Sequence, residues 1–159
     1  MCEIHKLKMT NEELKNSFAQ IFPAVTFDET GEFLTAFIPS EALLPVMKEL
    51  RSKKELYFDY LFCLTCVDWK DHLMMVYFLN SKTHNHTIVV KAKITDTINP
   101  KIESVYDIWK TAELNEDEIF DLFGVNFLNH PNLRRIFLED DWVGYPLRKN
   151  YVDEHMIEL

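Results

Sequence analysis

Hydrophobic residues recur with helical spacing in three parts of the chain. In the first part, Thr10 and Glu13 have the spacing of a capping box, and the pattern predicts a helix over residues 11–22. A second helix is expected after Ser40, which can cap it. Because proline is tolerated only in the first turn of a helix, Pro45 places the start of this second helix late. Its hydrophobic positions are Leu43, Leu44, Met47 and Leu50.

The third helical stretch, over residues 112–122, has a clear end and an ambiguous start. Gly124 is a natural residue to end it, whereas Thr111 and Asn115 both qualify as N-caps. Its polar positions are mostly acidic, namely Glu113, Glu116, Asp117, Glu118 and Asp121. A run of like charge on a helix is usually its solvent-facing side, and we expect the same of these residues.

Strand patterns fill the region between the second and third helices and a short stretch before it. Residues 26–38 predict a hairpin that turns at residues 29–31. Residues 60–69, 73–79 and 87–95 are rich in aromatic and β-branched side chains and are separated by short polar breaks. These runs predict an antiparallel meander, so the fold class is α+β.

Composition and charge exclude several classes of function. The chain has 159 residues, 47% of them hydrophobic, which suits one globular domain. Its three glycines lie too far apart for a Walker A loop, a dinucleotide-binding turn or a nucleophile elbow. A net charge of −9 disfavours nucleic acid and anionic lipid as partners. Since neither a signal peptide nor a membrane span is recognisable, we expect a soluble intracellular protein.

Cysteine and histidine residues are the first candidates for chemistry. Cys63 and Cys66 form a CxxC pair, but on a strand they would lie roughly 10 Å apart and on opposite faces. We therefore interpret them as small hydrophobic residues of the core. His84 and His86 flank a predicted turn, where we expect them to be solvated. The sequence thus predicts no catalytic, cofactor-binding or metal-binding residue.

Residues 129–159 differ from the rest of the chain because they sustain neither a helical nor a strand period. We divide the chain into a compact α+β part, residues 1–128, and this extended C-terminal segment, which belongs to the same domain. The segment either drapes over its own domain or lies along a partner. It contains residue types that dominate interfaces, namely Arg134, Arg135, Trp142, Tyr145 and Arg148.

Three motifs in the C-terminal third resemble the family of the C subunit of respiratory NADH–quinone oxidoreductase (complex I). Residues 116–124 read EDEIFDLFG, residues 130–136 read HPNLRRI, and residues 141–151 read DWVGYPLRKNY. The corresponding family patterns are ERExxDxFG, HPxLRRI and DWxGxPLRKDY. The chain departs from them at Asp117, which replaces an arginine, and at Asn150, which replaces an aspartate.

The resemblance implies a two-layer α+β fold, with helices on one face of a mixed, mostly antiparallel sheet. It also implies a non-catalytic structural subunit in the hydrophilic arm of a proton-translocating enzyme. Such a subunit is a peripheral protein on the cytoplasmic side of the bacterial inner membrane, and it meets the membrane only through the complex. It binds no cofactor, because FMN, iron–sulfur clusters and quinone belong to partner subunits.

The implied partners are the quinone-site and iron–sulfur subunits. The residues expected to contact them are Glu116, Glu118, Asp121, His130, Arg134, Arg135, Trp142, Tyr145, Arg148 and Lys149. Two alternatives remain open on the sequence. One is the equivalent subunit of a membrane-bound hydrogenase or another quinone oxidoreductase. The other is a free-standing thiol or metal protein that uses the cysteines and histidines.

Overall fold

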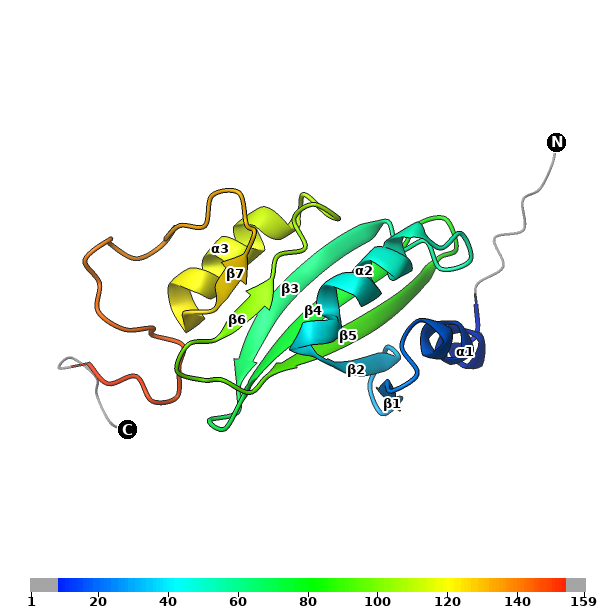
Figure 1. Ribbon diagram of the computed structural model, residues 1–159, viewed down its shortest axis with the longest axis horizontal. Coiled ribbons are helices and arrows are strands. Elements are labelled where there is room, and N and C mark those ends of the chain that lie inside the picture. The colour runs from blue at the N-terminus through cyan, green and yellow to red at the C-terminus, as the bar shows by residue number, and fades with distance from the viewer. Residues whose placement is uncertain (1–8, 154–159) are drawn as a thin grey trace.

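The computed structural model describes residues 9–153, which form three α-helices, a 3-10 turn and seven strands (Figure 1). In chain order the elements are α1 (Asn11–Ile21), β1 (Thr26–Asp28), β2 (Thr35–Pro39), a 3-10 turn η1 (Ser40–Ala42), α2 (Leu43–Ser52), β3 (Tyr60–Asp68), β4 (Leu73–Ser81), β5 (His86–Ile94), β6 (Lys101–Glu103), α3 (Ala112–Phe123) and β7 (Asn126–Leu128). Each predicted helix and strand is present, with most ends moved by one or two residues. The hairpin loop is longer than the predicted turn at residues 29–31 and spans residues 29–34.

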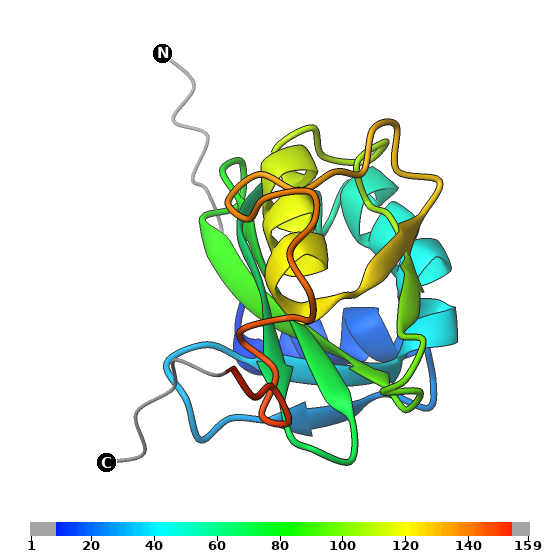
Figure 2. The same cartoon turned by 90° about the vertical axis from the view of Figure 1, so that its left-hand side faces the viewer.

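The main sheet has five strands in the order β1-β2-β5-β4-β3. The predicted meander is confirmed, because β3, β4 and β5 pair antiparallel in sequence, and β1 pairs antiparallel with β2 as the predicted hairpin. β2 then joins β5 in parallel, which makes the sheet mixed. Helices α2 and α3 cover one face of this sheet (Figures 1 and 2). The two-layer α+β class is therefore confirmed.

The core lies between the helices and the sheet. Along β4, Met75 and Tyr77 point into it and are fully buried, whereas the alternate residues Met74 and Phe78 are half-buried on the other face. Helix α1 adds Leu14 and Phe18 to the same core. The strands thus alternate between a covered face and a face without a covering element among residues 9–153.

The helix ends agree with the predictions in part. The capping box is present, since Glu13 N–H donates to Thr10 Oγ1 at 3.3 Å and Thr10 N–H to Glu13 Oε2 at 2.8 Å. Gly124 ends α3 in the left-handed region, at φ 74°. Ser40 as a cap of α2 is wrong, because the chain forms η1 there and α2 begins after Ala42 without a side-chain cap. Thr111 precedes α3, but its hydroxyl donates to the Leu61 carbonyl instead of capping.

A second, two-stranded sheet is not anticipated by the sequence pattern. β6 and β7 pair in parallel, with Ile102 opposite Phe127. Strands of three residues are too short to show a period in the sequence. This small sheet brings the chain before α3 beside the chain after it, and so fixes where the C-terminal segment begins.

The cysteines and histidines lie as the strand register dictates. Cys66 points into the core, where burial raises the pKa of its thiol to about 12, and Cys63 is half-buried on the other face. The prediction of opposite faces is confirmed. The interpretation as core residues is right for Cys66 and wrong for Cys63, because the strand register turns Cys63 to the uncovered face of the sheet. A solvated His86 is wrong, because it begins β5, is buried, and places Nε2 2.9 Å from the Leu56 carbonyl oxygen. His84 is half-buried, with Nε2 2.7 Å from the Lys54 carbonyl oxygen.

Metal-binding clusters and membrane spans are both absent from residues 9–153. The histidine, cysteine and carboxylate side chains of this range form no group of three or more that could hold a metal ion. The helices in the same range are too short and too polar to cross a bilayer.

Candidate functional site

The C-terminal segment, residues 129–153, folds back over α3 and the end of the sheet (Figure 2). Of the two arrangements that the sequence allowed, the structure shows the segment draped over its own domain. Its attachment depends on carboxylates of α3. The expectation that the acidic side chains of this helix face solvent is wrong for Glu116, Asp117 and Asp121, all of which are buried.

Asp121 holds the segment most firmly. Its Oδ2 accepts the backbone N–H groups of Ile136, Phe137 and Leu138 at 3.0, 2.7 and 3.0 Å. Its Oδ1 accepts Arg135 Nη1 at 3.0 Å. Burial alone would raise the pKa of Asp121, but these bonds to the charged form outweigh it and lower the pKa. The carboxylate therefore stays ionised inside the protein and fixes three consecutive residues of the segment.

Asp117 makes a second attachment. Its Oδ1 accepts the backbone N–H of Arg134 at 3.2 Å, while the Arg134 Nε lies 4.0 Å from its Oδ2. The Arg134 side chain remains 62% exposed. Asp117 stands at the position where the family pattern has arginine, and here it is a buried acceptor for a backbone N–H of its own chain. The guanidinium of Arg134 remains in solvent.

Glu116 is the least compensated of the three carboxylates. Its Oε2 accepts the Ser104 hydroxyl at 2.5 Å, and its Oε1 accepts the Val105 N–H at 2.8 Å. Burial nevertheless dominates and raises the pKa of Glu116 to about 7. The buried His130 Nε2 lies 3.7 Å from Glu116 Oε2 and makes no hydrogen bond within the described residues. Glu116 and His130 face each other in a closed interior.

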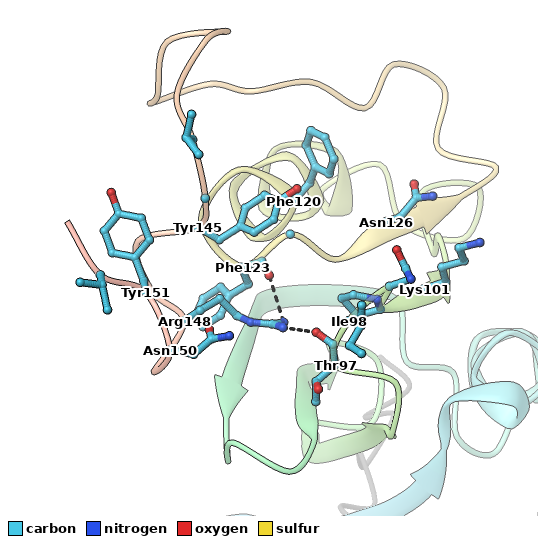
Figure 3. A pocket seen from close by; sticks show the side chains of 16 residues that line it. Thr97, Ile98, Lys101, Phe120, Phe123, Asn126, Tyr145, Arg148, Asn150 and Tyr151 are labelled. Carbon is cyan, nitrogen blue, oxygen red and sulfur yellow. Dashed lines mark hydrogen bonds between the residues drawn. The ribbon is translucent and has the colours of Figure 1, made fainter.

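Arg148 attaches the far end of the segment (Figure 3). Its guanidinium, which is largely buried, donates from Nη1 to the Phe123 carbonyl at 3.3 Å and from Nη2 to the Thr97 carbonyl. Its Nε lies 3.8 Å from Asp68 Oδ2. One side chain thereby joins the C-terminal end of α3, the loop after β5 and the end of β3.

Asp68 closes this attachment from the sheet side. Its two oxygens accept the backbone N–H groups of Lys149 at 2.9 Å and Lys70 at 2.7 Å. Burial would raise the pKa of Asp68, but the two N–H groups and the nearby Arg148 outweigh it and lower the pKa. Asp68 and Arg148 therefore compensate each other's charge.

Tyr145 packs against the glycine that ends α3. A Cβ atom added to Gly124 would lie 2.6 Å from Cδ2 and from Cζ of the Tyr145 ring, so only glycine allows this approach. Arg135 also approaches this ring, with its Cζ 5.7 Å from the Tyr145 ring centroid. Its Nη2 donates to the Trp142 carbonyl at 3.2 Å. The glycine, the tyrosine and the arginine together hold the middle of the segment against the end of α3.

A groove of about 750 Å³ lies between the segment, the end of α3 and the loop after β5 (Figure 3). Its walls include the aromatic side chains of Phe120, Phe123 and Tyr145 together with polar ones, such as Asn126 and Asn150. Its lining also includes three nearly fully exposed apolar residues, Ile98, Val143 and Val152, which are 86%, 87% and 85% exposed. An apolar rim with amide groups between aromatic walls suits a segment of another protein.

The structure separates the ten predicted partner contacts into two sets. The first is used inside the chain and is buried or largely buried: Glu116, Asp121, His130, Arg135, Arg148 and, half-buried, Tyr145. The second set is exposed, on α3 or on the C-terminal segment: Glu118, Arg134, Trp142 and Lys149. Contact of either set with a partner stays a prediction.

Sequence reasoning missed the exposed apolar residues around the groove and the partners of Arg148. Ile98 and Val143 are single apolar residues in loops, and no pattern distinguishes them from core residues. The Thr97 carbonyl contributes through its backbone, which the sequence does not reveal. Asp68 has one usable signal, since it is a lone acid that ends a hydrophobic strand.

Comparison with known proteins agrees with the three motifs. The sequence profile of the family described as "Respiratory-chain NADH dehydrogenase, 30 Kd subunit" matches residues 36–155. The chain is 47% identical over 123 residues to the C/D subunit of the NADH-quinone oxidoreductase of Phocaeicola vulgatus, covering 77% of this chain and 23% of that protein. It thus spans about a quarter of the length of that relative.

Two further similarities cover more of both proteins. The C subunit of the NADH-quinone oxidoreductase of Citrifermentans bemidjiense is 39% identical, over 87% of this chain and 85% of that one. Among solved structures, a chain of "the membrane-bound sulfane sulfur reductase (MBS), an archaeal respiratory membrane complex" superimposes with a TM-score of 0.68 at 26% identity, over 89% of this chain and 85% of that one. The resemblance drawn from the motifs is confirmed, and the chain belongs to the family of the 30 kDa subunit of respiratory-chain NADH dehydrogenase.

Proposed function

We propose that the chain is a non-catalytic structural subunit in the hydrophilic arm of a proton-translocating NADH–quinone oxidoreductase. It helps to hold the quinone-binding and iron–sulfur subunits together. The observation that carries this proposal is the C-terminal segment: buried charges fix it to α3, and it forms one side of a groove with exposed apolar residues. A rigid surface of this kind binds a partner at little entropic cost.

The buried charges themselves support a structural role. Asp121, Asp117 and Arg148 are engaged with backbone groups of their own chain. Glu116 and His130 face each other, but both side chains are fully buried and neither lines the groove. A catalytic acid or base must reach its substrate, so these groups serve the fold instead.

The cofactors and location follow from the same proposal. FMN, iron–sulfur clusters and quinone would be bound by partner subunits and none by this chain. The subunit would be peripheral, on the cytoplasmic side of the bacterial inner membrane, and would meet the membrane only through the complex. The oxidoreductase and translocase activity would belong to the assembled enzyme. The names of the relatives, which are subunits of an NADH–quinone oxidoreductase, support this assignment.

A second candidate is the equivalent subunit of another membrane-bound respiratory complex, such as a hydrogenase or a quinone oxidoreductase with a different electron donor. The observation in its favour is the structural similarity to a chain of the archaeal sulfane sulfur reductase complex, at a TM-score of 0.68. Both candidates use the same surface, and they differ in the subunits that supply the electron donor site.

Purification of the tagged chain from gently solubilised membranes tests the proposal. We expect a stable set of other subunits that carries FMN and iron–sulfur clusters and reduces quinone with NADH, while the isolated chain is colourless and inactive. Quinone reduction by the purified set with a donor other than NADH would support the second candidate. A chain that purifies alone with stoichiometric iron or zinc would contradict both candidates.

A further inference from the structure

The five-stranded sheet has one face that no element of residues 9–153 covers. Helices α2 and α3 pack on the opposite face, and α1 contributes to the same core (Figures 1 and 2). The open face is far from hydrophilic, because half-buried Phe78 and Met74 of β4 point out of it. An exposed apolar surface of this kind commonly marks an interaction site.

The strand register arranges the side chains of the open face in rows across β3, β4, β5 and β2. One row is Val67, Met74, Lys93 and Pro39. The next is Thr65, Val76, Lys91 and Phe37. A third is Cys63, Phe78, Val89 and Thr35. The middle of the face is therefore apolar, with two lysines of one central strand set into it. Val76, Val89 and Thr35 are buried by their neighbours, so the accessible apolar area is that of the half-buried Met74, Phe78 and Phe37 around them.

Aromatic residues extend the apolar area to the edge of the sheet. Phe62, at an irregularity of β3, is 42% exposed and places its ring 5.7 Å from that of Phe78. Tyr60 continues the contact, with its ring 6.2 Å from Phe62. Phenylalanine and tyrosine at this exposure contribute strongly to interfaces once they are covered.

The charge of this face differs from that of the chain. Lys91 and Lys93 both point out of it. Three acids lie at its margins: Asp28 on β1, whose charge interacts with Lys91, Asp71 in the turn after β3, whose charge interacts with Lys93, and Glu41 beside the hollow. The chain as a whole carries a net charge of −9. Because β5 is a central strand, the lysines do not serve to protect a sheet edge from pairing. Two like charges side by side on an apolar surface would be stabilised by carboxylates opposite them.

A hollow beside the lysines indicates how a partner would fit. It has a volume of about 280 Å³ and is lined by Phe37, Pro39 and Met74 as well as by Lys91 and Lys93. Its size and lining suit an apolar side chain. Carboxylates next to that side chain would lie against the lysines.

We propose that the open sheet face is a second docking surface, which binds an acidic segment of another subunit with an apolar side chain in the hollow beside Lys91 and Lys93. This proposal rests on the proposed function, because the partner is a subunit of the same complex. The two surfaces lie in different places. The groove lies between α3 and the C-terminal segment, whereas the open sheet face is formed by the strands.

Thiol labelling tests whether the face is covered. Cys63 lies on it, and Cys66 points into the core and serves as an internal control. The third cysteine of the chain, Cys2, is replaced by serine so that only Cys63 and Cys66 can react. In this Cys2→Ser variant, we expect N-ethylmaleimide to modify Cys63 at least about tenfold more slowly in the purified complex than in the free chain. Equal rates would overturn the proposal, while co-purification of the other subunits would still support the proposed function. Protection of Cys63 in the free chain through self-association would overturn it as well.

Carbodiimide coupling tests the chemistry of the partner. We expect Lys91 or Lys93 to couple to a carboxylate of another subunit in the complex. The variant Lys91→Arg/Lys93→Arg should assemble normally and lose this coupling. Lys91→Glu/Lys93→Glu should lower the assembled complex at least about tenfold, whereas Lys48→Glu/Lys54→Glu, a charge-matched control at exposed positions in and just after α2, should not. Normal assembly of the charge-reversed variant, or coupling only between copies of this chain, would contradict the proposal.

Discussion

Arg135 and Asp121 form a closed ion pair between the C-terminal segment and α3. Nη1 of the arginine lies 3.0 Å from Oδ1 of the aspartate, whose side chain has no exposed surface. The second oxygen of the aspartate accepts three consecutive backbone N–H groups. All four bonds join the segment to its own domain. The pair therefore fixes the segment on its own domain, and we expect it to shape the proposed partner surface instead of binding the partner directly.

Asp121→Ala should destabilise the isolated chain strongly. The change leaves Arg135 and three partly buried backbone N–H groups without their acceptor. Breaking a buried ion pair of this kind costs about 3–5 kcal/mol. Urea unfolding measures the loss, and Glu118→Ala, one turn away on the exposed side of α3, should stay within about 0.5 kcal/mol of the parent chain. Equal stability of the two variants would contradict the assignment of Asp121 as the main attachment.

Arg135→Ala should cost less than Asp121→Ala, because the aspartate keeps its three backbone donors. We expect a loss of about 2 kcal/mol in the free energy of unfolding, the usual size of a hydrogen bond to a charged group. Arg135→Lys should recover only part of it, since lysine cannot bond Asp121 and the Trp142 carbonyl with one planar group. Full recovery by lysine would show that the charge alone matters.

Glu116 makes the stability of the chain depend on pH near neutrality. Its pKa is raised from 4.5 to about 7 by burial, so the folded state favours the protonated form. This contribution is fully present below pH 4.5 and is lost as the pH rises through about 7. Relative to Glu116→Gln, the free energy of unfolding of the parent chain should fall by up to about 3 kcal/mol over that range.

Urea unfolding of both chains at several pH values checks this prediction. The comparison removes the contributions of Asp121 and Asp68, because these groups have lowered pKa values and lose stability in acid in both proteins. Making both chains in a His130→Asn background removes the neighbouring imidazole as well. Glutamine keeps one oxygen that can accept the Val105 N–H, and its amide NH2 can donate to the Ser104 hydroxyl oxygen in place of accepting from it. A constant difference between the two chains from pH 4.5 to pH 8 would contradict a raised pKa of Glu116.

Gly124→Ala should destabilise the chain in two ways. The backbone there has φ 74°, which costs an L-residue about 1–2 kcal/mol, and the new Cβ would displace the Tyr145 ring. In a Tyr145→Ala background only the backbone cost should remain. A double-mutant cycle by urea unfolding separates the two contributions, and a coupling energy of zero would exclude the steric contact with Tyr145.

The sequence was informative where side chains repeat along an element and less so where buried polar groups bond to the backbone. The capping box at Thr10, the meander and the glycine at the end of α3 all follow from local pattern. The interior position of Asp117 and Asp121 does not. Both belong to a run of acids that is typical of a solvent-facing helix side, and their partners are N–H groups far along the chain.

The position of the C-terminal segment could not be decided from the sequence for a similar reason. A stretch without a period makes no repeated contacts, so nothing local distinguishes a segment draped on its own domain from one laid on a partner. The deciding contacts are single bonds over long separations, such as Arg148 to the Thr97 carbonyl and Lys149 N–H to Asp68. The same limit applies to the groove, which forms only when these segments meet.

The turnover of complexes that contain Arg134→Ala tests the central claim most directly. Arg134 is 62% exposed, so its removal should leave the fold intact while it weakens contact with a neighbouring subunit. We expect less assembled complex in the membrane and a near-normal rate of NADH-to-quinone turnover per assembled complex. Full assembly with lost turnover would mean that Arg134 takes part in catalysis, and would contradict a structural role for this subunit.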